Sequence, residues 1–322
     1  MKKSLLFILV GILSIALLNC QRGSDQAGGA PRIAFVMKTA NNPFFIEMQK
    51  GAEAAAKKLG VNLIVQAAER EVDVEKQMQI VENLIQTKVA ALCVTPSGSR
   101  EIIPAIEKAN RAGIPVIIID TRVDAKALSE SQGKIASFIG SDNYEGGKLA
   151  GEFIVKRLGG KGKVAVLEGI PGHETGDSRL RGFREVIKST PGIEIVASQT
   201  ANWERDQGFN VFQNILQSHP DVQAVFACSD LMALGAVEAI AAAKKTGQIT
   251  VVGFDASDEA RAAVGRGTME ATVAQSPSEM GAFAVENASR LIKGEGIKDE
   301  IVVPIKLITK ENAGTTDASI SR

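Results

Sequence analysis

The stretch IAFVMKTANNPFFIEMQKGAEAAAKKLG, residues 33–60, contains a short apolar run followed directly by a segment of helical period. Residues 33–37 are all apolar, which is typical of a strand buried on both faces of a sheet. From Phe45 to Leu59 the apolar residues recur on one face of a helix, and Gly60 marks its end. The segment therefore predicts one strand–helix unit of a parallel sheet.

The same alternation continues along the rest of the chain. Apolar strands separated by helices indicate parallel sheets covered on both faces and built from right-handed βαβ units. Two series of such units, each about half of the chain, predict an α/β protein with two similar lobes. The expected strands are residues 33–37, 62–66, 89–94, 116–120 and 137–140, then 164–169, 193–199, 224–229, 249–254 and 271–275.

The first twenty residues, MKKSLLFILVGILSIALLNC, predict an export signal. Two lysines precede an apolar run from Leu5 to Leu18, which has the length of a secretory signal core. A transmembrane helix would need roughly 20 apolar residues, so this run is too short for a comfortable membrane span. Residues 21–31 contain mainly Gly, Ser, Gln and other small or polar residues, and we expect a flexible tether there.

The composition excludes several classes of function. The chain has 37 Lys and Arg against 37 Asp and Glu, so it lacks the basic surface that binds nucleic acid. With two histidines and no metal-type cysteine spacing, we expect no metal site, and Cys93 and Cys228 fit core positions. Dinucleotide, nucleotide-phosphate and hydrolase-elbow motifs are all missing, so we expect neither a cofactor nor catalysis.

Polar residues follow the expected strands, where ligand sites form in open parallel sheets. A helix N-cap explains any one of them, but it does not explain why each lies at the carboxyl end of a strand. Carboxylates, amides and arginines together match the hydroxyls of a neutral polyol, which both donate and accept hydrogen bonds. These residues are Asn41 and Asn42, Asp120, Ser229 and Asp230, Asp255 and Gln275.

A sugar ring also has an apolar face, which favours an aromatic partner. Phe44 and Phe45 follow the first strand; Phe45 fits the apolar stripe of its helix, whereas Phe44 lies off it. Trp203, the one tryptophan of a chain with only 4% aromatic residues, falls in a polar segment where a helix begins. We therefore expect these rings at a ligand site, with core packing as the alternative for Phe45.

Five motifs resemble the bacterial periplasmic sugar-binding proteins of ABC transporters, in the ribose- and galactose-binding group. They are NNPFF (41–45), HPDVQAVFA (219–227), MALGA (232–236), VVGFD (251–255) and VAQ (273–275), and the resemblance extends from residue 32 to about 312. It implies two Rossmann-like lobes with parallel sheets, joined by a three-stranded hinge, with a ligand cleft between them that closes by hinge bending. The implied N-terminal lobe is 32–141 plus 276–304, the C-terminal lobe is 142–275 plus 305–312, and 313–322 form a disordered tail.

The same resemblance implies which residues contact the ligand. In the first lobe they are Asn42, Phe44, Phe45 and Asp120, and in the second lobe Arg179, Trp203, Asp255 and Gln275. His173 and Trp203 are similar to residues of the galactose- and glucose-binding members. In departures from the ribose binders, Arg122 stands one residue further along, where it either reaches the ligand or leaves that role vacant, and Ser229 replaces the usual Asn before Asp230. These features favour a hexose over ribose, and we expect no bound calcium because the acidic calcium loop is missing.

The implied function is capture of a monosaccharide and its delivery to the ABC permease subunits of the inner membrane by a monomeric protein. Alternatives with the same fold are a ligand carrier for a chemoreceptor and a binder of a furanose-like signalling molecule. A sugar-sensing transcription regulator would need a DNA-reading segment ahead of the core.

The ending of the signal segment, Leu17-Leu18-Asn19-Cys20, resembles a lipoprotein signal, although Asn19 departs from it. The resemblance implies a protein anchored in the cell envelope through lipidated Cys20. A plain secretory peptide is the alternative.

Overall fold

The computed structural model describes residues 30–314 of the chain. The predicted signal peptide, the lipidation site Cys20, and most of the predicted tether and tail lie outside these residues. Within residues 30–314, no helix has the length and apolarity needed to cross a membrane.

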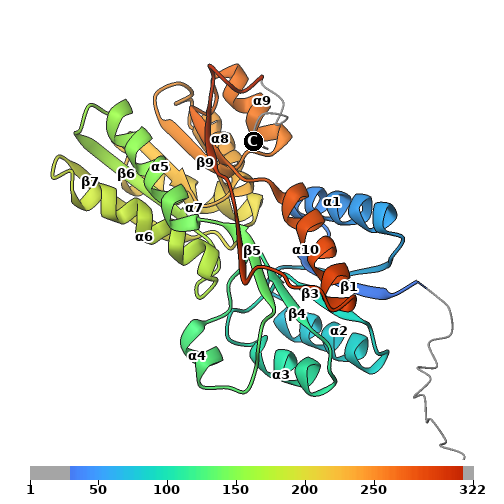
Figure 1. Cartoon of the computed structure of the whole chain (residues 1–322). Helices are drawn as coiled ribbons and strands as arrows, with labels where there is room; N and C mark the ends of the chain where they lie inside the picture. Colours follow the sequence, from blue (N-terminus) through green and yellow to red (C-terminus); the bar gives the residue numbers. More distant parts are fainter. Residues whose placement is uncertain (1–29, 315–322) are drawn as a thin grey trace, which may run out of the picture.

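Two six-stranded sheets form the framework (Figure 1). The strands of the first are β1 (Arg32–Thr39), β2 (Asn62–Ala68), β3 (Ala91–Val94), β4 (Val116–Ile119), β5 (Ser137–Ser141) and β11 (Glu300–Val303). The strands of the second are β6 (Gly162–Glu168), β7 (Ile193–Thr200), β8 (Ala224–Ala227), β9 (Thr250–Asp255), β10 (Ala271–Ala274) and β12 (Lys306–Thr309). Their spatial orders, β11-β5-β4-β3-β1-β2 and β12-β10-β9-β8-β6-β7, correspond strand for strand. Only β12, which runs antiparallel to β10, departs from parallel pairing in the sheets of the described chain.

Ten helices are found in the described part of the chain. They are α1 (Pro43–Leu59), α2 (Val74–Gln86), α3 (Ile103–Arg111), α4 (Ala125–Ser129), α5 (Asn143–Arg157), α6 (Glu174–Lys188), α7 (Arg205–Ser218), α8 (Asp230–Ala242), α9 (Asp258–Arg266) and α10 (Pro277–Ile292). We call the first sheet with α1–α4 and α10 the first lobe, and the second sheet with α5–α9 the second lobe. The predicted α/β fold class is confirmed, and all ten strands expected from the sequence are present.

Two helices cross between the lobes. Helix α5 follows β5 of the first sheet but packs against α6 and the second sheet, whereas α10 follows β10 of the second sheet but packs against α1 and the first. The third crossing is the short link between β11 and β12. The apolar strands at the centre of each sheet are almost fully buried, so each lobe has its own aliphatic core.

Glycines bring the crossing helices into backbone contact with their partners. A Cβ at Gly281 of α10 would lie 2.0 Å from the carbonyl oxygen of Met48 in α1, and one at Gly51 would lie 1.9 Å from that of Ser278. Helix α5 meets α6 in the same way, because a Cβ at Gly147 would lie 2.0 Å from the carbonyl oxygen of Arg179. These contacts leave no room for a side chain.

We predict that Gly281→Ala lowers the free energy of unfolding by about 1–3 kcal/mol, because the added methyl group forces α1 and α10 apart. Gly265→Ala in α9 is the matched control, since a Cβ there meets no atom within 4 Å. The control should gain up to about 1 kcal/mol from better helix propensity. Urea denaturation followed by circular dichroism measures both variants, and equal stability of the two would contradict the packing argument.

Candidate functional site

A small cavity of about 30 Å³ lies between the carboxyl ends of the strands of the two sheets. Both lobes contribute its walls, as expected where open parallel sheets face each other. From the first lobe it is lined by Lys38, Asn42, Phe44, Phe45, Glu71 and Asp120, and from the second by Thr175, Arg179, Trp203, Ser229 and Asp255.

Two aspartates occupy equivalent places in the two lobes. Asp120 directly follows β4 and Asp255 ends β9, and these strands hold the same position in the order of their sheets. Both residues have positive φ angles, 61° for Asp120 and 115° for Asp255, a backbone conformation that costs non-glycine residues of order 1–3 kcal/mol. Strain of this kind clusters at ligand sites, and here it accompanies carboxylates that line the cavity.

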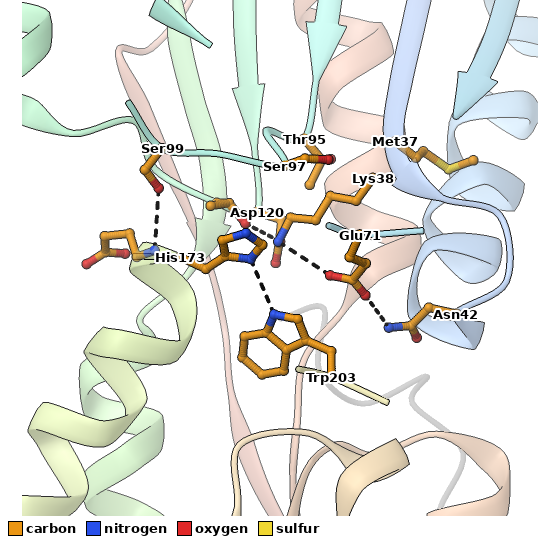
Figure 2. A network of polar contacts seen from close by, with 12 residues as sticks. Met37, Lys38, Asn42, Glu71, Thr95, Ser97, Ser99, Asp120, His173 and Trp203 are labelled. Atoms are coloured by element: carbon orange, nitrogen blue, oxygen red, sulfur yellow. Dashed lines mark hydrogen bonds and ion pairs between the residues drawn. The ribbon is translucent and has the colours of Figure 1, made fainter. Parts of the chain in front are cut away.

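The first-lobe wall is built around a buried ammonium group (Figure 2). Lys38 is only 2% exposed, and its Nζ lies 3.8 Å from Glu71 Oε2 and 3.9 Å from Asp120 Oδ2. Asn42 donates from Nδ2 to Glu71 Oε1 at 3.0 Å, while its Oδ1 accepts the N–H of Phe44 and caps α1. Burial raises the pKa of Glu71, and Lys38 and Asn42 oppose that rise.

Arg179 of α6 is the centre of the second-lobe wall. Its Nε donates to Asn143 Oδ1 at 2.8 Å and its Nη1 donates to the carbonyl of Cys228 at 2.6 Å. The same Nη1 lies 3.7 Å from Asp255 Oδ1, and the guanidinium carbon lies 3.7 Å from the centre of the Phe254 ring. Burial raises the pKa of the Asp255 carboxyl group, and the positive charge of Arg179 opposes that rise.

Aromatic rings line the cavity from both lobes. Phe44 and Phe45 lie edge to face with their centroids 5.3 Å apart, and both are nearly fully buried. Trp203, which has a positive φ of 66°, belongs to the opposite wall. Its Nε1 donates to Nδ1 of His173 at 3.3 Å, so the indole is held by a hydrogen bond as well as by packing.

Four of the predicted site residues do not line the cavity: Arg122, His173, Asp230 and Gln275. Arg122 stacks on Phe138, with 3.8 Å from its guanidinium carbon to the ring centre, and forms an ion pair with Glu300. In this structure the Arg122 side chain therefore lies along the first lobe and not at the cavity, and its contact with a ligand stays a prediction. The other three do not line this cavity. His173 holds Trp203, whereas Asp230 and Gln275 line an adjoining pocket that shares Asp255 with the cavity, and Gln275 Nε2 donates to Asp255 Oδ1 at 2.8 Å.

Asp230 ties together three elements of the second lobe. Its two carboxylate oxygens accept from Thr272 Oγ1 and from the N–H of Ser257, each at 2.7 Å. Ser229, one residue earlier, does line the cavity and also caps α8 through the N–H of Met232. Asp230 therefore fixes the segment that follows Asp255 rather than the cavity itself.

Lys38 and Glu71 are the two lining residues of the first lobe that the sequence analysis missed. Lys38 is the penultimate residue of β1, and Glu71 comes three residues after β2 ends. Lys38 directly follows the apolar run of residues 33–37 but still lies in the strand, whereas Glu71 stands five residues after the expected strand 62–66, and neither was predicted as a site residue. Within residues 30–314, no group of three or more His, Cys, Asp or Glu side chains is arranged to hold a metal ion.

Residues 33–296 match the family model of the periplasmic binding protein domain. The chain belongs to this family. The family resemblance inferred from the five motifs is thereby confirmed, and the family is one of binding proteins rather than of enzymes.

Curated relatives and solved structures agree with this membership. The ribose import binding protein of Bacillus subtilis is 41% identical over 279 residues, 87% of each chain. The D-allose-binding periplasmic protein of Escherichia coli is 37% identical, over 82% of this chain and 85% of that protein. A solute-binding protein from Actinobacillus succinogenes, solved with bound D-allose, is 41% identical with a TM-score of 0.83, covering 88% of this chain and 99% of its own.

For this periplasmic binding protein we predict that Asp230→Asn lowers the free energy of unfolding by about 1–3 kcal/mol, because the amide leaves one of two buried donors without an acceptor. Asp258→Asn, on the exposed first turn of α9, is the control and should change stability by less than about 0.5 kcal/mol. Urea denaturation measures both. Equal stability of Asp230→Asn and the wild type would show that the two hydrogen bonds contribute nothing to the fold.

Proposed function

We propose that this periplasmic binding protein captures a neutral monosaccharide between its lobes and delivers it to an ABC permease. The observation that carries the proposal is the make-up of the cavity wall, in which paired charges and aromatic rings from both lobes surround one small space. The relatives named above are described as binders of ribose or allose, which supports the same class of ligand.

The pairing of charges favours a neutral ligand. Lys38 is flanked by Glu71 and Asp120, and Arg179 by Asp255, so each buried cation already has an anionic neighbour. A sugar hydroxyl donates to a carboxylate and accepts from an ammonium or guanidinium group, and such charge-assisted hydrogen bonds are strong. The rings of Phe44, Phe45 and Trp203 supply flat apolar surfaces for the faces of the sugar ring.

A hexose is favoured over ribose. The two carboxylate neighbours of Lys38 lie 3.8 and 3.9 Å from its Nζ, which is too far for a hydrogen bond. The N–H groups of Lys38 are therefore available to a ligand oxygen. Together with Glu71 it offers a polar corner that a hydroxymethyl group of a hexose can fill. The solved relative with bound D-allose supports a hexose, and the equally similar ribose import binding protein makes D-ribose the competitor to be tested.

Entry of the ligand requires the lobes to separate. Lys38, Asp120 and Arg179 line the cavity yet are at most 4% exposed, so a sugar reaches them only when the cleft opens. The three crossings between the lobes are the places where such a hinge motion occurs.

We further propose export to the cell envelope and anchoring through Cys20, a residue outside the described structure. Mass spectrometry of the mature N-terminus from a native membrane fraction tests whether Cys20 carries a lipid.

D-allose should bind with a micromolar or lower Kd, equivalent to about −8 kcal/mol or better, and more tightly than D-ribose. Lys38→Met should weaken D-allose binding at least tenfold, roughly 1.4 kcal/mol, because a buried cationic donor is lost. Lys50→Met is the control, since Lys50 is exposed on α1 away from the cavity wall. Titration calorimetry with pentoses and hexoses measures all three, and no binding below millimolar concentration would overturn the proposed function.

The intrinsic fluorescence of the protein should change when the sugar binds. Trp203 is the one tryptophan of the chain and lines the cavity, so its emission reports on the site alone. Trp203→Phe should abolish the signal and weaken binding measured by calorimetry, because the larger stacking surface is lost. An unchanged emission spectrum in the presence of a sugar that binds by calorimetry would remove Trp203 from the ligand contacts.

A further inference from the structure

His173 lies at the boundary between the two lobes. It precedes α6, is buried, and accepts the Trp203 indole N–H through Nδ1, so the proton of the neutral ring is on Nε2 (Figure 2). The backbone of Ser97, in the first-lobe loop that follows β3, lies near enough to the imidazole to oppose the lowering of its pKa. Because the N–H of Ser97 already donates to Gln77 Oε1 at 2.8 Å, the carbonyl of Ser97 is the group that can accept from Nε2–H.

The next residue makes a second contact across the same boundary. The N–H of Glu174 donates to Oγ of Ser99 at 3.4 Å, again from the start of α6 to the loop after β3. Two successive residues of the second lobe therefore meet one loop of the first. Since the hinge motion proposed above separates the lobes, both contacts belong to the closed form.

We propose that His173 is a positioning residue, whose neutral imidazole holds Trp203 against the sugar and at the same time fastens the closed lobes through Ser97. This inference deepens the proposed function and rests on it, because it requires closure over a bound sugar. His173 therefore acts through Trp203 and the opposite lobe and does not contact the ligand. A residue with this double role makes sugar affinity depend on its protonation.

Protonation of His173 opposes closure. A proton on Nδ1 removes the acceptor for the Trp203 N–H and places a positive charge near Lys38. In the closed form burial, assisted by the charge of Lys38, lowers the pKa of His173 to about 3. In an open, hydrated cleft the pKa should return to about 6.5, the value of an unperturbed histidine.

The sign of the pH effect follows from these two states. The closed form has the lower pKa, so the affinity is complete above pH 6.5 and falls as the pH drops below it, by about 30-fold at pH 5.0. Buried carboxyl groups act in the opposite direction where closure raises their pKa, so wild type and variant must be compared at each pH. Lys38 is the first-lobe charge that acts on the imidazole, with Glu71 and Asp120 beside it; on its own lobe, Glu174 is the next residue and Arg179 lies over the Trp203 ring.

The test uses His173→Gln, whose amide can accept from Trp203 and donate to Ser97 but does not titrate. Dissociation constants of D-allose are measured by calorimetry at pH 5.0 and 7.5 for the wild type, for His173→Gln and for His219→Gln. His219, the other histidine of the chain, directly follows α7 and does not line the cavity, so it is the matched control. The ratio of wild-type to His173→Gln Kd should rise about 30-fold from pH 7.5 to 5.0.

The outcomes separate the inference from the proposed function. A rising ratio together with a wild-type profile for His219→Gln supports the inference. Sugar binding with a ratio that stays constant between the two pH values overturns it and leaves the proposed function standing. Failure of the wild type to bind any pentose or hexose at pH 7.5 overturns the proposed function, and the inference fails with it.

Discussion

The buried guanidinium of Arg179 is the constraint on which the second half of the site depends. A buried cation is tolerated only when its hydrogen-bond donors and its charge are met by nearby partners. Arg179 finds them on separate elements, because Asn143 begins α5, Cys228 follows β8 and Asp255 ends β9. The ring of Phe254 covers one face of the group. Satisfying this one charge therefore fixes the ends of three elements that surround the cavity.

The first lobe meets the same requirement in another way. Its buried cation, Lys38, lies inside a strand and stands between two carboxylates at distances too long for direct hydrogen bonds. Arg179 donates two of its five N–H groups to protein acceptors, whereas Lys38 keeps its donors for a ligand. Asp120 and Asp255 face each other from equivalent strands, so the sugar would sit between two similar acceptors that differ in the cation beside them.

The sequence predicts the fold and much of the site because both follow from local pattern. Apolar runs mark the strands, and in parallel sheets the carboxyl end of a strand locates the ligand, which identifies Asn42, Asp120 and Asp255. The direction in which a side chain points does not follow from local pattern. Arg122 turns to Phe138 and Glu300, a residue 178 positions away, and this partner is absent from any local pattern. Lys38 and Glu71 were missed because their places relative to the cavity depend on where β1 and β2 end in space.

The hydrogen bonds of the site reach directly into the crossings between the lobes. Asn143, the first residue of α5 after the chain leaves β5, accepts from Arg179 Nε. Gln275, between β10 and α10, donates to Asp255 Oδ1, while its own Oε1 is buried without a hydrogen-bond partner. Two of the three crossings are thus one hydrogen bond away from a group that lines the cavity. The crossing helices themselves are held by backbone contacts at glycines, so they move with the lobe on which they pack. In the proposed hinge motion, flexing would then be confined to the few residues between strand and helix. A sugar that binds Arg179 and Asp255 would act on those residues through a single hydrogen bond.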